Sequence, residues 1–432
     1  MTSTVIQGGR VVDQTGIRRC DVRVDDESGL ITEVGEGLTG DTTLDAQRCW
    51  VAPGFVDIHA HVREPGNEQW GTIESESRAA ALGGYTAIVA MPDTDPPADN
   101  ASVVKEILAL SRDALCEVSP AGAITVGRQG TALAPLGEMA DLGVRIFTDS
   151  GHSLQDALVM RRAMEYANGI STDDGARVVI AQHPQLDALA VDGVMHEGGW
   201  SARLGLEGQL AEAEEIMIMR EVALARLTGA RVHIHHVTTA NSVNLIRGAK
   251  ANGVLITADV TPHHLLLTDA ACQSYDANTK VAPPMRTDVD IQALRAGLAD
   301  GTIDAIATDH APVGVDAKEL PFDQAPFGVV GLETALPVLL TSLGKPFEAL
   351  LPALSWRPAD IAGLRSRHGG PIEPGRCANL VVVDPSAEWT IDRTTLSGPS
   401  TNTPFDGVTV RGRIRHTIYE GQPVVIDAKA MR

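Results

Sequence analysis

Between residues 53 and 364, short apolar runs alternate with longer Ala-rich segments in which apolar residues recur with helical spacing. A strand buried on both faces is a continuous apolar run, whereas an amphipathic helix repeats its apolar positions every three to four residues. Two clear helical segments are 74–82 and 211–227. The predicted strands are 53–59, 85–91, 119–126, 143–148, 177–182, 231–237, 254–260 and 303–308.

Eight such strand–helix units predict an α/β protein with a (β/α)₈ TIM-like barrel over residues 53–364. A doubly wound open sheet is the alternative, but it more often carries a glycine-rich phosphate loop after its first strand, and none follows here. The ends of the chain, 1–52 and 365–432, contain short strands separated by turns. We expect these ends to pair into one small discontinuous β-sandwich domain.

Composition and charge limit the partners. The formal net charge of −21 argues against nucleic acid or an anionic membrane as a partner. No apolar run is long enough to cross a membrane, and the first residues do not form a signal-peptide pattern. The five cysteines follow no metal-binding spacing, which favours reduced thiols and a cytoplasmic location.

Candidate chemistry lies at the strand ends. His59 and His61 are two residues apart in a strand, so their side chains point the same way and form half of a metal site. Alone, such a pair is equally well explained as two surface histidines. In a parallel barrel, however, active sites lie at the C-terminal ends of the strands. Further strand ends carry Asp149, His183, His235 and His236, and Asp309 with His310.

One such aspartate would most often be a helix N-cap, but agreement among five strand ends favours a single polar cluster. Its ligand types fit two divalent metal ions, with zinc favoured by the number of imidazoles. Asp149 is placed to bridge the ions, and Asp309 both to bind one and to act as a base. Paired metals polarise a carbonyl and lower the pKa of a shared water towards ~7, which indicates hydrolysis.

Several motifs, in this order, resemble bacterial dihydroorotases of the amidohydrolase superfamily: DIHAHVREPG, FTDSG, HIHHVTT, VTPHHLLLT, APPMR, IATDHAP and GLETALP. The resemblance runs over nearly the whole chain. It distinguishes this chain from allantoinases and dihydropyrimidinases, which have a carboxylated lysine where this chain has Asp149. The resemblance implies that Asp309 is the catalytic base. It also implies metal ligands His59, His61 and Asp309 for one ion, His183 and His236 for the other, and Asp149 between them.

The implied substrate contacts differ from the family pattern. Arg63 is retained and suits bidentate binding of a carboxylate. Asp93 and Ala282 replace asparagines, and Val313 replaces a histidine. An ionised Asp93 would repel a carboxylate by about 1 to 4 kcal/mol at 4 Å. Three accounts remain open: Arg63 neutralises Asp93, Asp93 is protonated, or the loop 313–327 supplies other contacts through Lys318.

The sequence therefore predicts a binuclear metal-dependent hydrolase of a small cyclic amide or ureide. The leading activity is dihydroorotase, which converts dihydroorotate and water to N-carbamoyl-L-aspartate. One alternative is a related hydrolase of a ring without the carboxylate, such as a hydantoin, dihydropyrimidine or imide. Another is an inactive homologue that scaffolds aspartate carbamoyltransferase, although intact metal ligands argue against it. The resemblance also implies a homodimer.

Overall fold

Eight parallel strands form a ring in the computed structural model, which describes residues 2–172 and 175–432. Two runs of paired strands, β8-β9-β10 and β11-β12-β15-β16-β17, make up the ring. Backbone bridges close it at Gly122 to Phe147 and at Ala60 to His310. The strands are β8 (Phe55–Ala60), β9 (Tyr85–Ala90), β10 (Glu117–Pro120), β11 (Ile146–Phe147), β12 (Val179–Gln182), β15 (Val232–Ile234), β16 (Ile256–Val260) and β17 (Ala305–Ile306).

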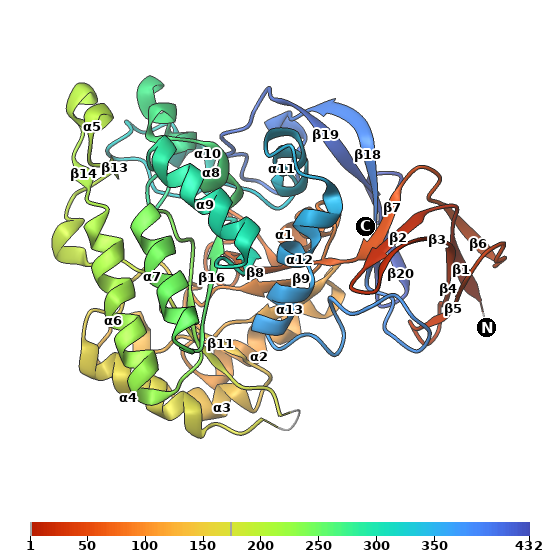
Figure 1. Ribbon diagram of the computed structural model, residues 1–432, viewed down its shortest axis with the longest axis horizontal. Helices are drawn as coiled ribbons and strands as arrows, with labels where there is room; N and C mark the ends of the chain where they lie inside the picture. The colour runs from red at the N-terminus through yellow and green to blue at the C-terminus, as the bar shows by residue number, and fades with distance from the viewer. Residues whose placement is uncertain (1, 173–174) are drawn as a thin grey trace.

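Helices follow the strands and cover the ring from outside (Figure 1). The two helical segments noted in the sequence correspond to α1 (Ile73–Leu82) and α6 (Glu212–Thr228). The remaining helices are α2 (Ala101–Leu110), α3 (Leu136–Ala140), α4 (Ala157–Gly169), α5 (Gly199–Leu204), α7 (Ala240–Ala251), α8 (Pro262–Leu266), α9 (Asp288–Asp300), α10 (Val315–Lys318), α11 (Ala335–Ser342), α12 (Phe347–Leu354) and α13 (Trp356–Ile361). Among these described helices none is long and apolar enough to cross a membrane.

The third predicted strand, 119–126, is wrong in its position. The strand ends at Pro120, Gly122 still bridges to Phe147, and only then does the chain leave the sheet. The N–H groups of Ile124 and Thr125 bind the side chain of Asp149 rather than a neighbouring strand. The segment therefore belongs to the loops around the candidate site, although its apolar composition resembles that of a strand.

Both ends of the chain contribute to a β-sandwich beside the barrel (Figure 1). β7 pairs with β18 in the register Val51 to Val382, which joins the N-terminal and C-terminal segments in one sheet. The sheet order is β21-β20-β19-β18-β7-β2-β3, and a second sheet has the order β5-β4-β1-β6. Buried side chains such as Ile6, Val22 and Ile418 form the core between them. The predicted fold class is confirmed, while the domain boundaries stay a prediction.

The strands of the sandwich are β1 (Ser3–Gln7), β2 (Arg10–Asp13), β3 (Gly16–Arg19), β4 (Asp21–Asp25), β5 (Ile31–Gly35), β6 (Thr42–Asp45), β7 (Trp50–Pro53), β18 (Leu380–Thr390), β19 (Thr409–Tyr419), β20 (Gln422–Ile426) and β21 (Lys429–Ala430). A separate pair, β13 (Met195–His196) and β14 (Gly208–Gln209), lies in the connection that precedes α6. This connection carries Gln209 towards the candidate site.

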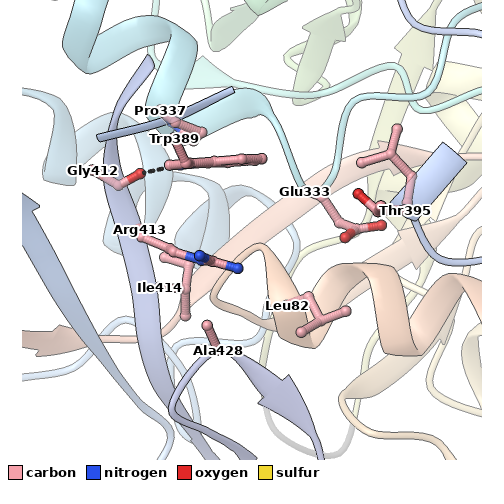
Figure 2. A pocket seen from close by; sticks show the side chains of 10 residues that line it. Leu82, Glu333, Pro337, Trp389, Thr395, Gly412, Arg413, Ile414 and Ala428 are labelled. Atoms are coloured by element: carbon pink, nitrogen blue, oxygen red, sulfur yellow. Dashed lines mark hydrogen bonds between the residues drawn. The ribbon is translucent and has the colours of Figure 1, made fainter. Parts of the chain in front are cut away.

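A cavity of about 180 Å³ lies where the C-terminal strands meet α1 and α11 (Figure 2). Trp389 donates a hydrogen bond from Nε1 to the carbonyl of Gly412, and the guanidinium of Arg413 lies 5.6 Å from the centre of the Trp389 ring system. Glu333 points into the same space, and burial raises its pKa to about 7. None of the predicted site residues lines this cavity.

Candidate metal centre

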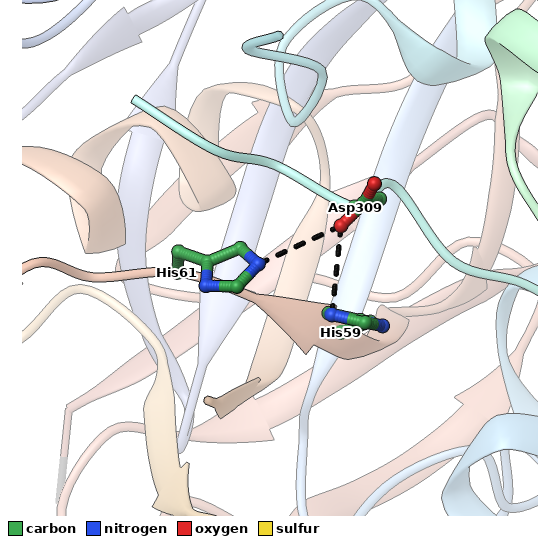
Figure 3. Close-up of side chains that lie close together, drawn as sticks. All are labelled: His59, His61 and Asp309. Atoms are coloured by element: carbon green, nitrogen blue, oxygen red, sulfur yellow. Dashed lines mark ion pairs between the residues drawn. The ribbon is translucent and has the colours of Figure 1, made fainter. Parts of the chain in front are cut away.

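His59, His61 and Asp309 converge at the C-terminal ends of the first and last barrel strands (Figure 3). The Nε2 atoms of His59 and His61 lie 3.5 Å and 3.6 Å from Oδ1 of Asp309. All three residues are buried, and their nearest ligand atoms lie within 4.8 Å of one another. This arrangement matches three of the predicted ligands and can hold one metal ion.

A local irregularity in β8 positions His59. The pairing of β8 with β9 shifts between Asp57 and Ala60. The N–H of His59 instead donates to Oδ1 of Asp57 at 3.1 Å, and the N–H of Thr308 donates to the same atom at 3.1 Å. Asp57 thus connects the first strand to the residue before Asp309. Burial raises the pKa of Asp57 to about 7.

His183 and His236 form a second pair near the first group. Nδ1 of His183 lies 2.9 Å from Nε2 of His236, and their ring centroids are 4.6 Å apart. Burial lowers the pKa of His183 to about 4 and that of His236 well below its ordinary value. Neutral imidazoles are the form that binds a metal, so this environment suits the predicted ligand role.

Three residues behind these pairs form a buried network. Oδ2 of Asp259 lies 2.9 Å from Nε2 of His233 and 3.0 Å from Nδ1 of His235. The N–H of His236 also donates to Oδ1 of Asp259. Asp259 therefore orients the backbone of one proposed ligand, as expected of groups that support a metal centre.

Three buried histidine nitrogen atoms around the site have no hydrogen-bond partner among the described residues. They are Nδ1 of His59, Nε2 of His235 and Nδ1 of His236. Leaving such atoms unsatisfied costs free energy. The nitrogen atoms that do converge, Nε2 of His59 and His61 on Asp309 and Nδ1 of His183 on Nε2 of His236, form a histidine and aspartate donor set that is suitable for divalent metal ions.

Asp149 is not brought into the group formed by His59, His61 and Asp309. Its Oδ1 accepts hydrogen bonds from the N–H groups of Ile124 (2.9 Å) and Thr125 (3.0 Å), and its Oδ2 accepts one from the Thr125 hydroxyl (2.5 Å). The neighbouring Ser150 hydroxyl lies 3.1 Å from Nε2 of His59. The bridging role of Asp149 therefore stays a prediction, and these contacts compete with it.

The histidines and Asp309 open into a cavity of about 260 Å³. Three of the four predicted substrate contacts, Arg63, Asp93 and Ala282, line it. Val313 does not line it: its side chain is buried, and its N–H donates to Oδ1 of Asn402 at 3.2 Å. Gln185, Gln209, Ala311, Phe327 and Gly328 also line this cavity. Its walls beyond the metal ligands are therefore mostly uncharged.

The contacts of Asp93 distinguish between neutralisation by Arg63, protonation of Asp93 and replacement contacts from Lys318. Oδ2 of Asp93 accepts a hydrogen bond from Nη1 of Arg63 at 2.8 Å. Burial alone would raise the pKa of Asp93, but its contacts with His61 and Arg63 hold it well below its usual range, so the carboxyl is ionised. Lys318 donates to the carbonyls of Ala277 and Pro326 and does not line the cavity. The geometry favours neutralisation by Arg63.

Several cavity and network residues were not identified from the sequence. Asp57 stands two residues before His59, so its place on the same strand was a usable signal. Asp259 lies inside an apolar strand, where a charged residue is itself unusual. Gln185 lies in an irregular connection and Gln209 at the end of the short strand β14, and neither offered such a signal.

The fold and the site together define a barrel protein with candidate metal-binding histidine and aspartate groups. In solved structures, the chain is similar to L-hydantoinase (dihydropyrimidinase) from Arthrobacter aurescens, with a TM-score of 0.88, 24% identity and coverage of 100% of this chain and 98% of that one. It is also similar to dihydropyrimidinase from Brevibacillus agri NCHU1002, with a TM-score of 0.83, 20% identity and coverage of 99% and 96%. These similarities confirm the barrel fold.

A family match and two relatives identify the family of this chain. Residues 49–242 match the family described as "Dihydro-orotase-like". A dihydroorotase from Leifsonia xyli is 46% identical over 412 residues, covering 93% of this chain and 92% of the relative. A dihydroorotase from Pelotomaculum thermopropionicum is 43% identical and covers 98% of both chains. The chain therefore belongs to the dihydroorotase family, as predicted, and is a hydrolase of the C–N bonds of cyclic amides.

Proposed function

We propose that this protein hydrolyses dihydroorotate to N-carbamoyl-L-aspartate. The observation that carries the proposal is the convergence of His59 and His61 on Asp309 at the open end of the barrel. The names of its relatives, at 46% and 43% identity, support this substrate. The reaction opens the ring at an amide C–N bond.

Asp309 is the proton carrier in the proposed reaction. A water oxygen forms a bond to the ring carbonyl carbon, and the bond from that carbon to the ring nitrogen breaks. Asp309 accepts one proton from the water and donates it to the leaving nitrogen, so the same carboxyl acts first as base and then as acid. Its position beside both histidines supports this role.

Two divalent metal ions, zinc in the first instance, are the proposed cofactors. His59, His61 and Asp309 would hold one, His183 and His236 the other, and Asp149 would bridge them. Bound ions supply polarisation of the ring carbonyl and a lower pKa for water. Asp149→Ala tests the bridge: the bound zinc, measured by elemental analysis, should fall from two ions per chain to one, and an unchanged content would contradict this assignment.

A substrate panel tests the activity. The zinc-loaded protein should open dihydroorotate with a kcat/KM of at least ~10⁴ M⁻¹s⁻¹, in the ordinary enzyme range. Dihydrouracil, hydantoin and succinimide serve as rings without the carboxylate. If the protein opens one of these rings faster than dihydroorotate, that ring is the better candidate substrate. If metal-loaded protein opens no ring at all, the proposal is refuted.

A ring without the carboxylate is the second candidate substrate, and one contact favours it. Nη1 of Arg63 is already paired with Asp93, and the rest of the cavity wall offers no lysine or further arginine among the described residues. If the pocket has lost its binding site for a substrate carboxylate, restoring the two asparagines should recover it. The double variant Asp93→Asn, Ala282→Asn should then gain dihydroorotate activity at saturating metal. Ala282 is chosen because it lines the cavity, unlike Val313. No gain would count against this candidate.

The protein is further proposed to be a homodimer and to be located in the cytoplasm. The five cysteines are unpaired, which supports a reducing location. Sedimentation equilibrium tests the dimer, and a single monomeric species would contradict it. Scaffolding of aspartate carbamoyltransferase is a separate role, supported only if the two proteins co-sediment.

A further inference from the structure

We propose that Asp93 is a positioning residue for the metal ligand His61, and that Arg63 holds Asp93 in place. Oδ1 of Asp93 lies 2.7 Å from Nδ1 of His61, and Oδ2 accepts from Nη1 of Arg63 at 2.8 Å. The residue that departs from the family pattern in the substrate pocket thus supports the metal centre. The inference deepens the proposed function and rests on it for the identity of the ligands.

The contact fixes which nitrogen of His61 is available to a metal. A carboxylate accepts hydrogen bonds and donates none, so Nδ1 of His61 carries the proton that is shared with Asp93. Nε2 then keeps its lone pair, and this is the atom that faces Oδ1 of Asp309 at 3.6 Å. A carboxylate on the outer nitrogen of a ligating histidine fixes the ring and increases its basicity.

Only a carboxylate serves both neighbours of Asp93. His61 and Arg63 each present an N–H, so the residue between them must offer two acceptors. An asparagine has one acceptor oxygen and one NH₂ donor, and it would direct that donor at either the histidine or the arginine. Asparagine at this position therefore leaves one of the two contacts unmade.

Arg63 is anchored in a way that suits a structural role. Its Nε donates to the carbonyl of Pro312 at 3.0 Å, while its guanidinium lies 5.8 Å from the centre of the Trp70 ring system. The side chains of Arg63 and Asp93 are 13% and 14% exposed, so solvent weakens their ion pair less than at an open surface. The pair links the loops that follow the first, second and last barrel strands.

His61 has a partner on its outer nitrogen, whereas two other proposed ligands, His59 and His236, have none there in the described ranges 2–172 and 175–432. The unpartnered atom is Nδ1 in both of them. The proposed support therefore acts on one metal position rather than on both. We expect loss of Asp93 to weaken one of two bound ions selectively.

Metal affinity in Asp93→Asn tests this role. Zinc competition against a chromophoric chelator should show one site weakened by about 10- to 100-fold, with the second site unchanged. Asp95→Asn is the matched control, because it removes the same charge from the same loop at an exposed residue. Zinc affinity within twofold of the wild type in Asp93→Asn would overturn the proposal. Near-UV circular dichroism confirms that both variants are folded.

Arg63→Gln tests the second half of the proposal. It should weaken the same zinc site by at least twofold but less than Asp93→Asn does, because Asp93 retains its contact with His61. Unchanged affinity in Arg63→Gln would overturn the role given to Arg63. Both titrations are independent of the substrate: if metal-loaded wild type opens no ring, the proposed function fails while the effect of Asp93 on metal binding is still measured.

Discussion

Asp57 on the first barrel strand accepts hydrogen bonds from Thr308, which follows the last strand, through both the N–H (3.1 Å) and the hydroxyl of Thr308. The same carboxylate accepts the N–H of His59. One side chain therefore sets the relative position of two ligand-bearing segments. The barrel closes at the same place, where Ala60 bridges to His310.

Asp57→Ala should destabilise the protein and weaken metal binding together. Two buried N–H groups would lose their acceptor, at a cost of about 2 to 4 kcal/mol in the free energy of unfolding. Thr308→Val removes only the hydroxyl and should cost less. Urea unfolding of the zinc-loaded proteins measures which of the two variants loses more stability. An Asp57→Ala variant as stable as wild type would refute the role of Asp57.

Asp309→Asn should abolish ring opening and leave much of the metal bound. The amide keeps an oxygen ligand but cannot accept and return the proton, so kcat should fall by about 10²- to 10⁴-fold. Elemental analysis of the purified variant gives the metal content alongside the rate. Retained activity would show that the base lies elsewhere.

Removal of the metal should abolish activity and lower the melting temperature. Ions that bind only the folded state stabilise it, by about 4 kcal/mol at a free concentration 1,000 times the dissociation constant. Dialysis against a chelator followed by differential scanning calorimetry measures the loss, and re-addition of zinc should reverse it. Equal melting temperatures with and without the metal would contradict binding at the buried histidines.

The order of barrel strands was predictable because each parallel strand is a continuous apolar run between helical segments. The ends of the strands were less predictable where backbone N–H groups bind side chains instead of a neighbouring strand. The segment 119–126 is apolar enough for a strand, yet the N–H groups of Ile124 and Thr125 bind Asp149. Such a contact joins residues about two dozen positions apart and leaves no periodic pattern in the sequence.

The candidate site was predictable to the extent that strand geometry determines it. His59, His61 and Asp309 meet because alternate residues share a face and parallel strands end on one side of the barrel. The link from His61 to Asp93 crosses 32 positions in the chain, and side-chain packing alone creates it. The competing contacts of Asp149 with Thr125 have the same origin.

Glu333, which lies outside the metal centre, should make the free energy of unfolding depend on pH. Its pKa is raised by burial from 4.5 to about 7, so the folded protein holds a proton that the unfolded chain releases. Stability therefore falls as the pH rises from about 4.5 to about 7, and the full cost, at most about 3 kcal/mol, persists above that window.

Glu333→Gln should remove that dependence and stabilise the protein at pH 8 more than at pH 5. Gln cannot ionise in the cavity between the barrel and the C-terminal strands, while every other titrating group is common to the two proteins (Figure 2). Glu388→Gln is the control, because Glu388 is exposed on β18. The measurement is the urea midpoint of each protein at both pH values. Equal gains at pH 5 and pH 8 would show that the carboxyl of Glu333 titrates normally in the folded protein.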